Sequence, residues 1–386
     1  MDNPFRYGEV ASGEFFTNRV EELAELEQDL RSGQNVMMMS PRRYGKTSLI
    51  QQVIARLRAD GVLVVYLDLF GIPTKEIFVR EFAKALHLGL FGPARQMMQS
   101  VLDAFKGLSI VPRFSLDDAG KPVLELAPAA RSGDVDRDID VLLALPERIA
   151  QDRKKRVVLV FDEFQQIVEL DPRLVPRMRS IFQNQPGVAH VYLGSRFHLM
   201  NNLFNNINEP MYKSAKSVPL LPFKSSDFAS FIRARFTETQ KTISDEAIDR
   251  ILEITGCHPN DTQQLCYFTW ALAHATGRPP TPELVDQALD RIVSAEDARY
   301  TLLWESLSAR QRTLLLALAN ATGQIFSERF RKEHQLGSAA TVQTAANRLK
   351  EREIIEPRTG GGYAIPDVFL KAWIRRTLLA SREPGQ

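Results

Sequence analysis

The sequence has little of what marks a secreted or membrane-spanning protein. It contains only two cysteines, Cys257 and Cys266, which excludes a disulfide framework or a cysteine-rich zinc site and favours a reducing compartment. No run approaches the roughly 18 uninterrupted apolar residues of a membrane span. The opening MDNPFRYGEV has neither the basic start nor the apolar core of a signal peptide. We therefore expect a cytoplasmic protein with no membrane partner.

The sequence also lacks a large excess of either positive or negative charge. The 386 residues include 49 Lys and Arg against 47 Asp and Glu, a formal net charge of +2. A chain that is not basic throughout can contact nucleic acid only through a local patch. The hydrophobic share of 44% and charged share of 25% exclude a disordered chain and predict two to three domains of about 150 residues.

The first half of the chain alternates strand and helix patterns. Continuous apolar, β-branched runs occur at residues 62–68, 156–164 and 189–195, and residues 34–39 (QNVMMM) predict a short buried strand. Such runs are typical of strands covered on both faces. Because sequence of helical periodicity separates them, the pattern predicts an α/β domain with a parallel sheet and right-handed crossovers. We place this domain at residues 1–218.

Two further elements are predicted within this domain. Residues 18–31 form an amphipathic helix, whose apolar residues recur at spacings of three and four. These residues are Val20, Leu23, Leu26 and Leu30. Residues 112–128 contain two short alternating runs around Asp118-Ala119-Gly120, which predict an inserted β-hairpin. The hairpin is either a surface decoration or a device that docks a partner.

Beyond residue 218 the β-branched runs stop. Residues 219–300 are helical by periodicity, with breaks at Gly256 and Pro259, and predict an all-α domain. Residues 301–386 predict three helices followed by two strands, the second of them at 363–370. This is the order of elements in a winged helix.

Residues 40–47 match the phosphate-loop pattern GxxxxGK[ST] at every position but the first, where Ser40 replaces glycine. A predicted strand precedes the loop and a helix follows it, so successive backbone N–H groups would face a phosphate chain. The Lys46 ammonium would reach the β- and γ-phosphates, and the Thr47 hydroxyl would bind Mg²⁺. The predicted nucleotide-binding residues of the loop are Ser40, Pro41, Arg42, Arg43, Tyr44, Gly45, Lys46, Thr47 and Ser48. The alternative interpretation is a basic turn at a helix start.

An acidic pair ends the third predicted strand. Asp162 and Glu163 follow the apolar run VVLVF, at the strand end where open α/β sheets bind ligands. Asp162 suits the Mg²⁺ shell, directly or through water. Glu163 could then orient and deprotonate a water in line with the γ-phosphate, which would make it the catalytic base. Alternatively, Glu163 is an acid stabilised by a helix dipole.

These motifs together resemble the archaeal-type ATPase family, which belongs to the STAND branch of the AAA+ superfamily. The stretches that carry the resemblance are FFTNRVEELAEL, SPRRYGKTSLI, VYLD, VLVFDEFQ, VYLGSR and ITGCHPNDTQQLC, in this order and before a winged helix. The resemblance implies a P-loop, AAA+-like α/β fold with helices on both faces of the sheet, then a helical lid at 219–300 and a winged helix at 301–386. Ser40 departs from the glycine that the family usually has.

The resemblance also implies roles for residues outside the two motifs. Arg19 matches the N-terminal box whose helix lies beside the nucleotide, and the entry Asn3-Pro4-Phe5 would cover the adenine. Ser195 and Arg196 end the strand that carries the γ-phosphate sensor, which makes them catalytic candidates. His258-Pro259 resembles the stretch that closes the lid over the base, although His258 could equally cap a lid helix. The ligands implied are ATP or ADP with Mg²⁺.

Positive charge is concentrated at the end of the chain. Residues 305–386 hold 13 Lys and Arg against 8 Asp and Glu, about +5. The third helix of the winged helix, at 338–352, should bury Val342, Ala345, Ala346 and Leu349. It leaves polar and basic residues on its other faces, namely Thr341, Gln343, Thr344, Asn347, Arg348 and Lys350. Residues 338–358, including Arg358 beside a flexible Gly360-Gly361-Gly362 tip, could therefore contact duplex DNA. Alternatively, the winged helix packs against the lid or docks a protein.

Two functions follow from this sequence. One is an ATPase that acts as a regulatory nucleotide switch and binds a protein partner or a second copy of itself. The other is a DNA-binding initiator or helper ATPase. Glu163 favours the second, whereas the lack of a convincing arginine finger favours the first, since Arg177 and Arg179 are equally typical of a solvated helix.

Overall fold

A computed structural model describes residues 2–10, 19–40, 43–92, 110–116, 122–128, 134–220, 223–321, 324–358 and 362–379. The chain divides into two compact units, one of residues 10–222 and one of residues 1–9 with 223–386. Residues 1–9, which we predicted within the ATPase core, therefore pack in the C-terminal unit instead. The helical lid and the winged helix fall together in that unit, and the boundary between them stays a prediction.

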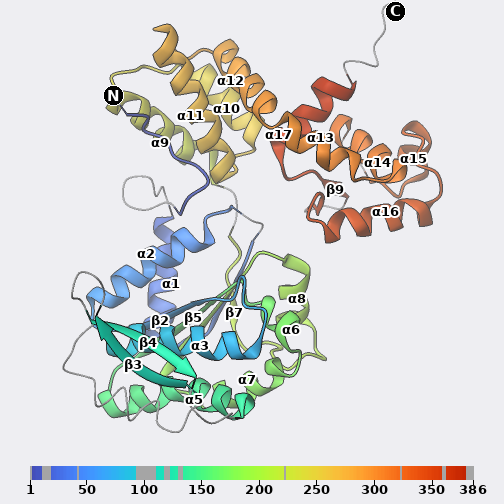
Figure 1. The fold of residues 1–386 in the computed structure, drawn as a ribbon. Coiled ribbons are helices and arrows are strands. Elements are labelled where there is room, and N and C mark those ends of the chain that lie inside the picture. The colour runs from blue at the N-terminus through green and yellow to red at the C-terminus, as the bar shows by residue number, and fades with distance from the viewer. Residues whose placement is uncertain are drawn as a thin grey trace, which may run out of the picture. The chain divides into compact units, whose positions relative to one another are not determined.

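The unit of residues 10–222 is built on a five-stranded parallel sheet with the strand order β2-β5-β6-β1-β7 (Figure 1). Its strands are β1 (Val36–Met39), β2 (Leu63–Asp68), β5 (Val157–Asp162), β6 (Val188–Gly194) and β7 (Lys216–Ser217). The parallel α/β sheet predicted from the apolar runs is confirmed. Strand β7 was not predicted from the sequence, because its two polar residues form neither an apolar run nor an alternating pattern.

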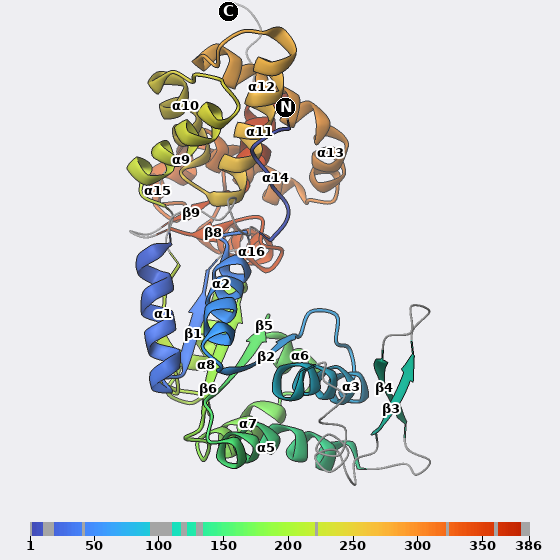
Figure 2. The ribbon, with the colours of Figure 1, turned by 90° about the vertical axis from the view of Figure 1, so that its left-hand side faces the viewer.

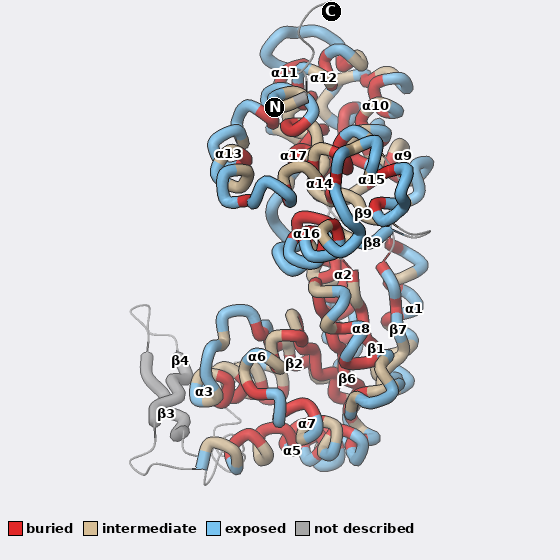
Figure 3. Tube along the Cα trace, turned by 90° about the vertical axis from the view of Figure 1, so that its right-hand side faces the viewer, coloured by how far each residue is buried: buried red, intermediate tan, exposed pale blue. Residues whose placement is uncertain are grey.

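Helices cover both faces of this sheet (Figure 2). The helices are α1 (Val20–Ser32), α2 (Lys46–Ala59), α3 (Lys75–Leu86), α5 (Val135–Arg153), α6 (Gln166–Leu170), α7 (Leu174–Phe182) and α8 (Phe197–Asn205), with a π-helical turn at His87–Phe91. Side chains alternate along each strand, so Met38 packs with α1 and α2 while Met37 packs with α3 and α5. Strands β1, β5 and β6 are mostly buried between the two layers (Figure 3), whereas the edge strand β7 is not.

The structure confirms most of the apolar face that was predicted for helix α1. Leu23, Leu26 and Leu30 are buried against the sheet, whereas Val20 is 71% exposed, so its predicted burial was wrong. At 3.6 residues per turn, Val20 points roughly 90° away from the mean direction of the three leucines. The spacing of three from Val20 to Leu23 alone does not place both on one buried stripe.

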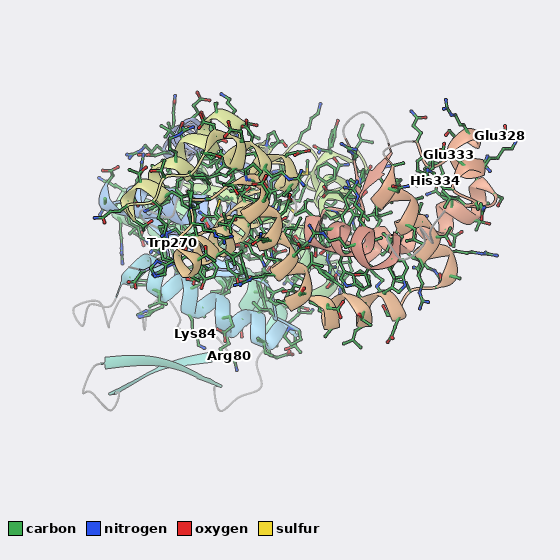
Figure 4. All side chains as sticks on the ribbon, turned by 90° about the horizontal axis from the view of Figure 1, so that it is seen from above. Arg80, Lys84, Trp270, Glu328, Glu333 and His334 are labelled. Atoms are coloured by element: carbon green, nitrogen blue, oxygen red, sulfur yellow. The ribbon has the colours of Figure 1, made fainter. Side chains whose placement is uncertain are left out.

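The predicted β-hairpin is present as β3 (Ile110–Leu116) paired antiparallel with β4 (Pro122–Pro128). Residues 118–120, where we predicted its turn, lie outside the described residues. Strand β4 contacts helix α3, on which Figure 4 labels Arg80 and Lys84. Both of these side chains pair with Glu81 of the same helix.

The C-terminal unit is helical except for a small hairpin. Its elements are α9 (Ser225–Glu238), α10 (Asp245–Thr255), α11 (Pro259–Thr276), α12 (Pro282–Ala295), α13 (Asp297–Glu305), α14 (Ala309–Asn320), α15 (Glu328–Glu333), α16 (Ala339–Glu351), β8 (Glu356–Pro357), β9 (Tyr363–Ala364) and α17 (Val368–Trp373), then a π-helical segment at Ile374–Leu379. One hydrophobic core runs through all of it. Among the described residues, no helix is both long enough and apolar enough to span a bilayer.

The last predicted strand, 363–370, was largely wrong. Only Tyr363–Ala364 pair with β8, and the chain then turns into helix α17. Pro366 cannot donate to a strand ladder. The Asp367 side chain accepts hydrogen bonds from the backbone N–H groups of Phe369 and Leu370, and so caps the new helix.

Candidate active site

The phosphate loop connects β1 to α2. Gly45 is the residue before α2 and has φ +86°, which glycine adopts without strain. Lys46 begins the helix with a side chain only 5% exposed, and its Nζ donates a hydrogen bond to the backbone oxygen of Ser40 at 2.7 Å. The ammonium therefore folds back over its own loop. Pro41 and Arg42, two of the predicted binding residues, lie outside the described residues.

The N-terminus of α2 has the electrostatics of an anion site. Its first turn contains no acidic residue, so no carboxylate of that turn competes for the unpaired N–H groups. Thr47 is half-buried and Ser48 is buried in that turn, while in the loop Tyr44 is half-buried and Arg43 is exposed. The loop thus offers backbone donors, a cation and a hydroxyl to a phosphate chain.

One hydrogen bond connects the carboxyl end of β5 to this loop. The Thr47 hydroxyl donates to Asp162 Oδ2 at 3.0 Å, and the Tyr66 hydroxyl donates to the same oxygen at 2.6 Å. The other oxygen, Oδ1, accepts the backbone N–H of Glu163 at 2.9 Å. Burial and the negative charge of Asp162 hold the pKa of Tyr66 well above its usual range, so Tyr66 stays a donor. The Asp162 carboxylate is fixed on both oxygens.

Side chains that could hold a divalent cation lie at this edge of the sheet. Asp68 and Asp162 are register partners on β2 and β5. Burial raises the pKa of Asp68, the backbone N–H of Phe70 lowers it, and the charges of Asp162 and Glu163 raise it further. Among the described residues, no group of three or more His, Cys, Asp or Glu forms a metal cage. Mg²⁺ commonly needs only one or two carboxylates plus substrate phosphates, and this edge offers the Asp162 carboxylate with the Thr47 hydroxyl beside it.

Glu163 lies in the turn between β5 and α6. Its φ of +51° is unusual for a residue other than glycine and costs about 1–3 kcal/mol, a kind of strain that clusters at functional sites. Its Oε2 accepts a hydrogen bond from Ser195 Oγ at 2.7 Å and another from Gln165 Nε2. The structure thus brings together the predicted base and one of the two predicted sensor residues.

Arg196 and Arg19 are engaged elsewhere in the same unit. Arg196 forms an ion pair with Glu169 of α6. Arg19 is the residue before α1, is 4% exposed, and its Nη1 pairs with Glu22 Oε1 at 2.7 Å. For both arginines the predicted contact with nucleotide stays a prediction.

Two predicted nucleotide residues belong to the other unit. Phe5 is 1% exposed, and its ring lies 5.1 Å from that of Phe236 in the helical core. Phe5 therefore packs in the helical core of that unit, and its predicted contact with the adenine stays a prediction. Pro259 is the first residue of α11. His258 caps that helix by accepting the N–H of Asp261, which is the capping alternative considered from the sequence.

Sequence reasoning missed Tyr66 and Gln165. Tyr66 stands in the run VYLD, where an aromatic residue is typical of a buried strand. Gln165 follows DEF, a stretch in which functional roles were assigned only to the acidic residues. The available signal was position, since Tyr66 lies two residues before the carboxyl end of β2 and Gln165 lies three residues after that of β5.

Comparison with known proteins yields two family matches. The family described as an ATPase domain predominantly from Archaea matches residues 16–265, and the one described as a probable winged helix domain matches residues 298–376. No curated protein sequence matches the chain.

Solved structures resemble the whole chain at low sequence identity. The Walker-type ATPase PABY2304 of Pyrococcus abyssi is 16% identical with a TM-score of 0.65, over 94% of this chain and 97% of that one. The ORC2 protein of Aeropyrum pernix, described as ADPNP-ADP complexes, is 14% identical with a TM-score of 0.55, over 98% and 99%. These likenesses show the fold, an AAA+-like P-loop α/β domain followed by helices and a winged helix.

Proposed function

The chain belongs to the family of ATPase domains found predominantly in Archaea, and we propose that it binds ATP with Mg²⁺, hydrolyses it, and acts as a regulatory nucleotide switch of the STAND type. One observation carries the proposal. Lys46, Thr47, Asp162 and Glu163 all lie at the carboxyl ends of β1 and β5, joined by the hydrogen bond from Thr47 to Asp162. This is where parallel sheets bind ligands.

Phosphate binding would use groups already in place. A γ-phosphate oxygen can replace the Ser40 carbonyl as the partner of the Lys46 ammonium, exchanging a neutral acceptor for a charged one. Charge-assisted hydrogen bonds are roughly twice as strong as neutral ones. The N-terminal N–H groups of α2 would bind the remaining phosphate oxygens. Bound at Thr47 and Asp162, Mg²⁺ would supply positive charge to offset the developing charge on the phosphates.

Hydrolysis requires a base near the γ-phosphate. Glu163 is half-buried, follows Asp162 directly, and is held by Ser195 from the next strand, β6. A carboxylate in this place can accept a proton from a water in line with the γ-phosphate. Asp162 is not the base in this proposal, because both of its oxygens accept hydrogen bonds from neighbouring groups.

A switch requires groups that distinguish ATP from ADP. Ser195 is bonded to Glu163 and Arg196 to Glu169. A γ-phosphate that draws either donor to itself must exchange these contacts, and ADP cannot do so. A ligand shifts a conformational equilibrium only through such differential contacts, which supports a nucleotide-dependent change that starts at the end of β6.

DNA binding is the second candidate function, and helix α16 supports it. Its predicted buried face is confirmed, with Val342, Ala345, Ala346 and Leu349 in the core. The opposite face exposes Gln343, Thr344, Asn347 and Arg348. Polar and basic side chains on one exposed helix face can contact base edges and phosphates in a major groove.

Steady-state ATPase assays test both candidates. We expect Mg²⁺-dependent phosphate release from the wild-type chain, suppressed by EDTA and absent in Lys46→Ala. Stimulation by duplex DNA would favour the initiator or helper ATPase, whereas a low rate unaffected by DNA would favour the switch. Absence of both ATP binding and hydrolysis would contradict the proposed function.

A further inference from the structure

The carboxylate of Glu163 is held by one of its two oxygens. Oε2 accepts hydrogen bonds from Ser195 Oγ and from Gln165 Nε2. Across the part of the chain that the structure describes, no donor is found for Oε1. The two donors therefore fix the rotamer of Glu163 and leave Oε1 as the oxygen that could accept a proton from water.

Gln165 is the more deeply buried of the two donors, at 0% exposure against 6% for Ser195. Its side chain is fully buried, at 0% exposure, and lies against the end of β6. A Cβ atom at Gly194 would come within 2.7 Å of Gln165 Oε1 and within 2.4 Å of Met200 Cγ. Glycine at position 194 thus leaves the space that the amide occupies.

The hydrogen bond from Gln165 to Glu163 leaves the amide oxygen of Gln165 without a partner among the described residues. Within the described residues, Gln165 Oε1 is buried and has no hydrogen-bond partner, which destabilises the folded chain. Exchanging the amide nitrogen and oxygen would set an oxygen against the carboxylate of Glu163, so the donor must face Glu163. A glutamine kept only for packing would not leave its acceptor unsatisfied.

We propose that Gln165 is a positioning residue that holds Glu163 in its catalytic rotamer. The inference rests on the proposed role of Glu163 as the base. Ser195 is at the same time the candidate sensor, and a γ-phosphate that attracts its hydroxyl removes one of the two donors. Gln165 has no access to the nucleotide because it is buried, so it keeps Glu163 in place when Ser195 exchanges partners.

The substitution Gln165→Met tests this role. Methionine has a similar volume and no donor, and it also removes the unsatisfied oxygen, so we expect a melting temperature equal to or above that of the wild type. We expect kcat for ATP to fall roughly tenfold to a hundredfold, as for a misplaced reacting group, while Kd for ATP stays within about twofold. Gln166→Met is the matched control, because Gln166 is the adjacent glutamine and donates to Glu163 only through its backbone N–H.

A double-mutant cycle separates positioning from a general structural effect. In the Glu163→Gln background, single-turnover rates should be unchanged by Gln165→Met, because the group it positions is gone. A kcat within twofold of the wild type in Gln165→Met, or a loss that persists in the Glu163→Gln background, would overturn the inference while leaving the ATPase proposal intact. A wild-type chain without hydrolysis would overturn both.

Discussion

The hydroxyl of Thr47 donates a hydrogen bond to Asp162 Oδ2 across 3.0 Å. This contact joins the first turn of α2 to the end of β5, residues that are 115 positions apart in the sequence. It places a hydroxyl oxygen and a carboxylate oxygen side by side at the phosphate loop. The site is therefore organised by the fold itself, and its parts can be tested one at a time.

Lys46→Ala should abolish ATP binding and leave the fold intact. The Lys46 ammonium is the charge that backbone dipoles alone cannot replace. Lys84→Ala is the control, since Lys84 is exposed on α3 and pairs with Glu81, and it should bind ATP as the wild type does. Isothermal titration calorimetry measures both, and unchanged affinity in Lys46→Ala would remove the loop from the nucleotide site.

Tyr66→Phe should weaken only the Mg²⁺-dependent part of ATP binding. The lost hydroxyl orients Asp162, and the loss of such outer partners typically costs roughly tenfold or more in metal affinity. Asp162→Asn should weaken the same part of the affinity by more. Titrations with and without Mg²⁺ distinguish the two contributions, and an equal loss in the absence of Mg²⁺ would show that Tyr66 acts on the fold instead.

Duplex DNA, if it binds, should do so through α16 with few contacts. Three to five phosphate contacts predict a log–log salt slope of about −3 to −4.5. Arg348→Ala should make that slope shallower by about 0.9, whereas Lys332→Ala, on α15 and paired with Glu328, should not. Gel retardation with the full chain measures this. A lack of any retardation at low salt would favour a docked protein partner.

The switch predicts two distinguishable nucleotide states. ATP-bound Glu163→Gln and ADP-bound wild type should differ in their scattering profile or oligomeric state, because only ATP can compete for Ser195 and Arg196. Arg196→Ala should reduce the difference. Small-angle scattering combined with light scattering tests this, and identical profiles in both states would leave a plain hydrolase.

Much of the α/β unit was predictable because buried parallel strands are continuous apolar runs. The carboxyl ends of β2, β5, β6 and β1 lie side by side in the sheet, so residues that follow these runs had to converge. That reasoning placed Asp162 and Glu163 at the edge of the sheet where they lie, and the family resemblance placed Ser195 at the end of the neighbouring strand.

Other features depend on tertiary contacts that no local pattern encodes. Phe5 packs beside Phe231 and Phe236, and nothing in its sequence neighbourhood reveals these partners. The roles of Tyr66 and Gln165 exist only because Asp162 and Glu163 lie next to them. The helix α17 needed its cap, Asp367, to be recognised after Pro366.

The most direct test of the account is the single-turnover hydrolysis of ATP by Glu163→Gln. The variant should bind ATP and Mg²⁺ with the wild-type affinity, because the Glu163 carboxylate is held by Ser195 and Gln165 and not by the described residues of the phosphate loop. It should hydrolyse ATP at least roughly a hundredfold more slowly, the range expected when a general base is removed. Hydrolysis at the wild-type rate with intact binding would contradict the assignment of Glu163 as the base.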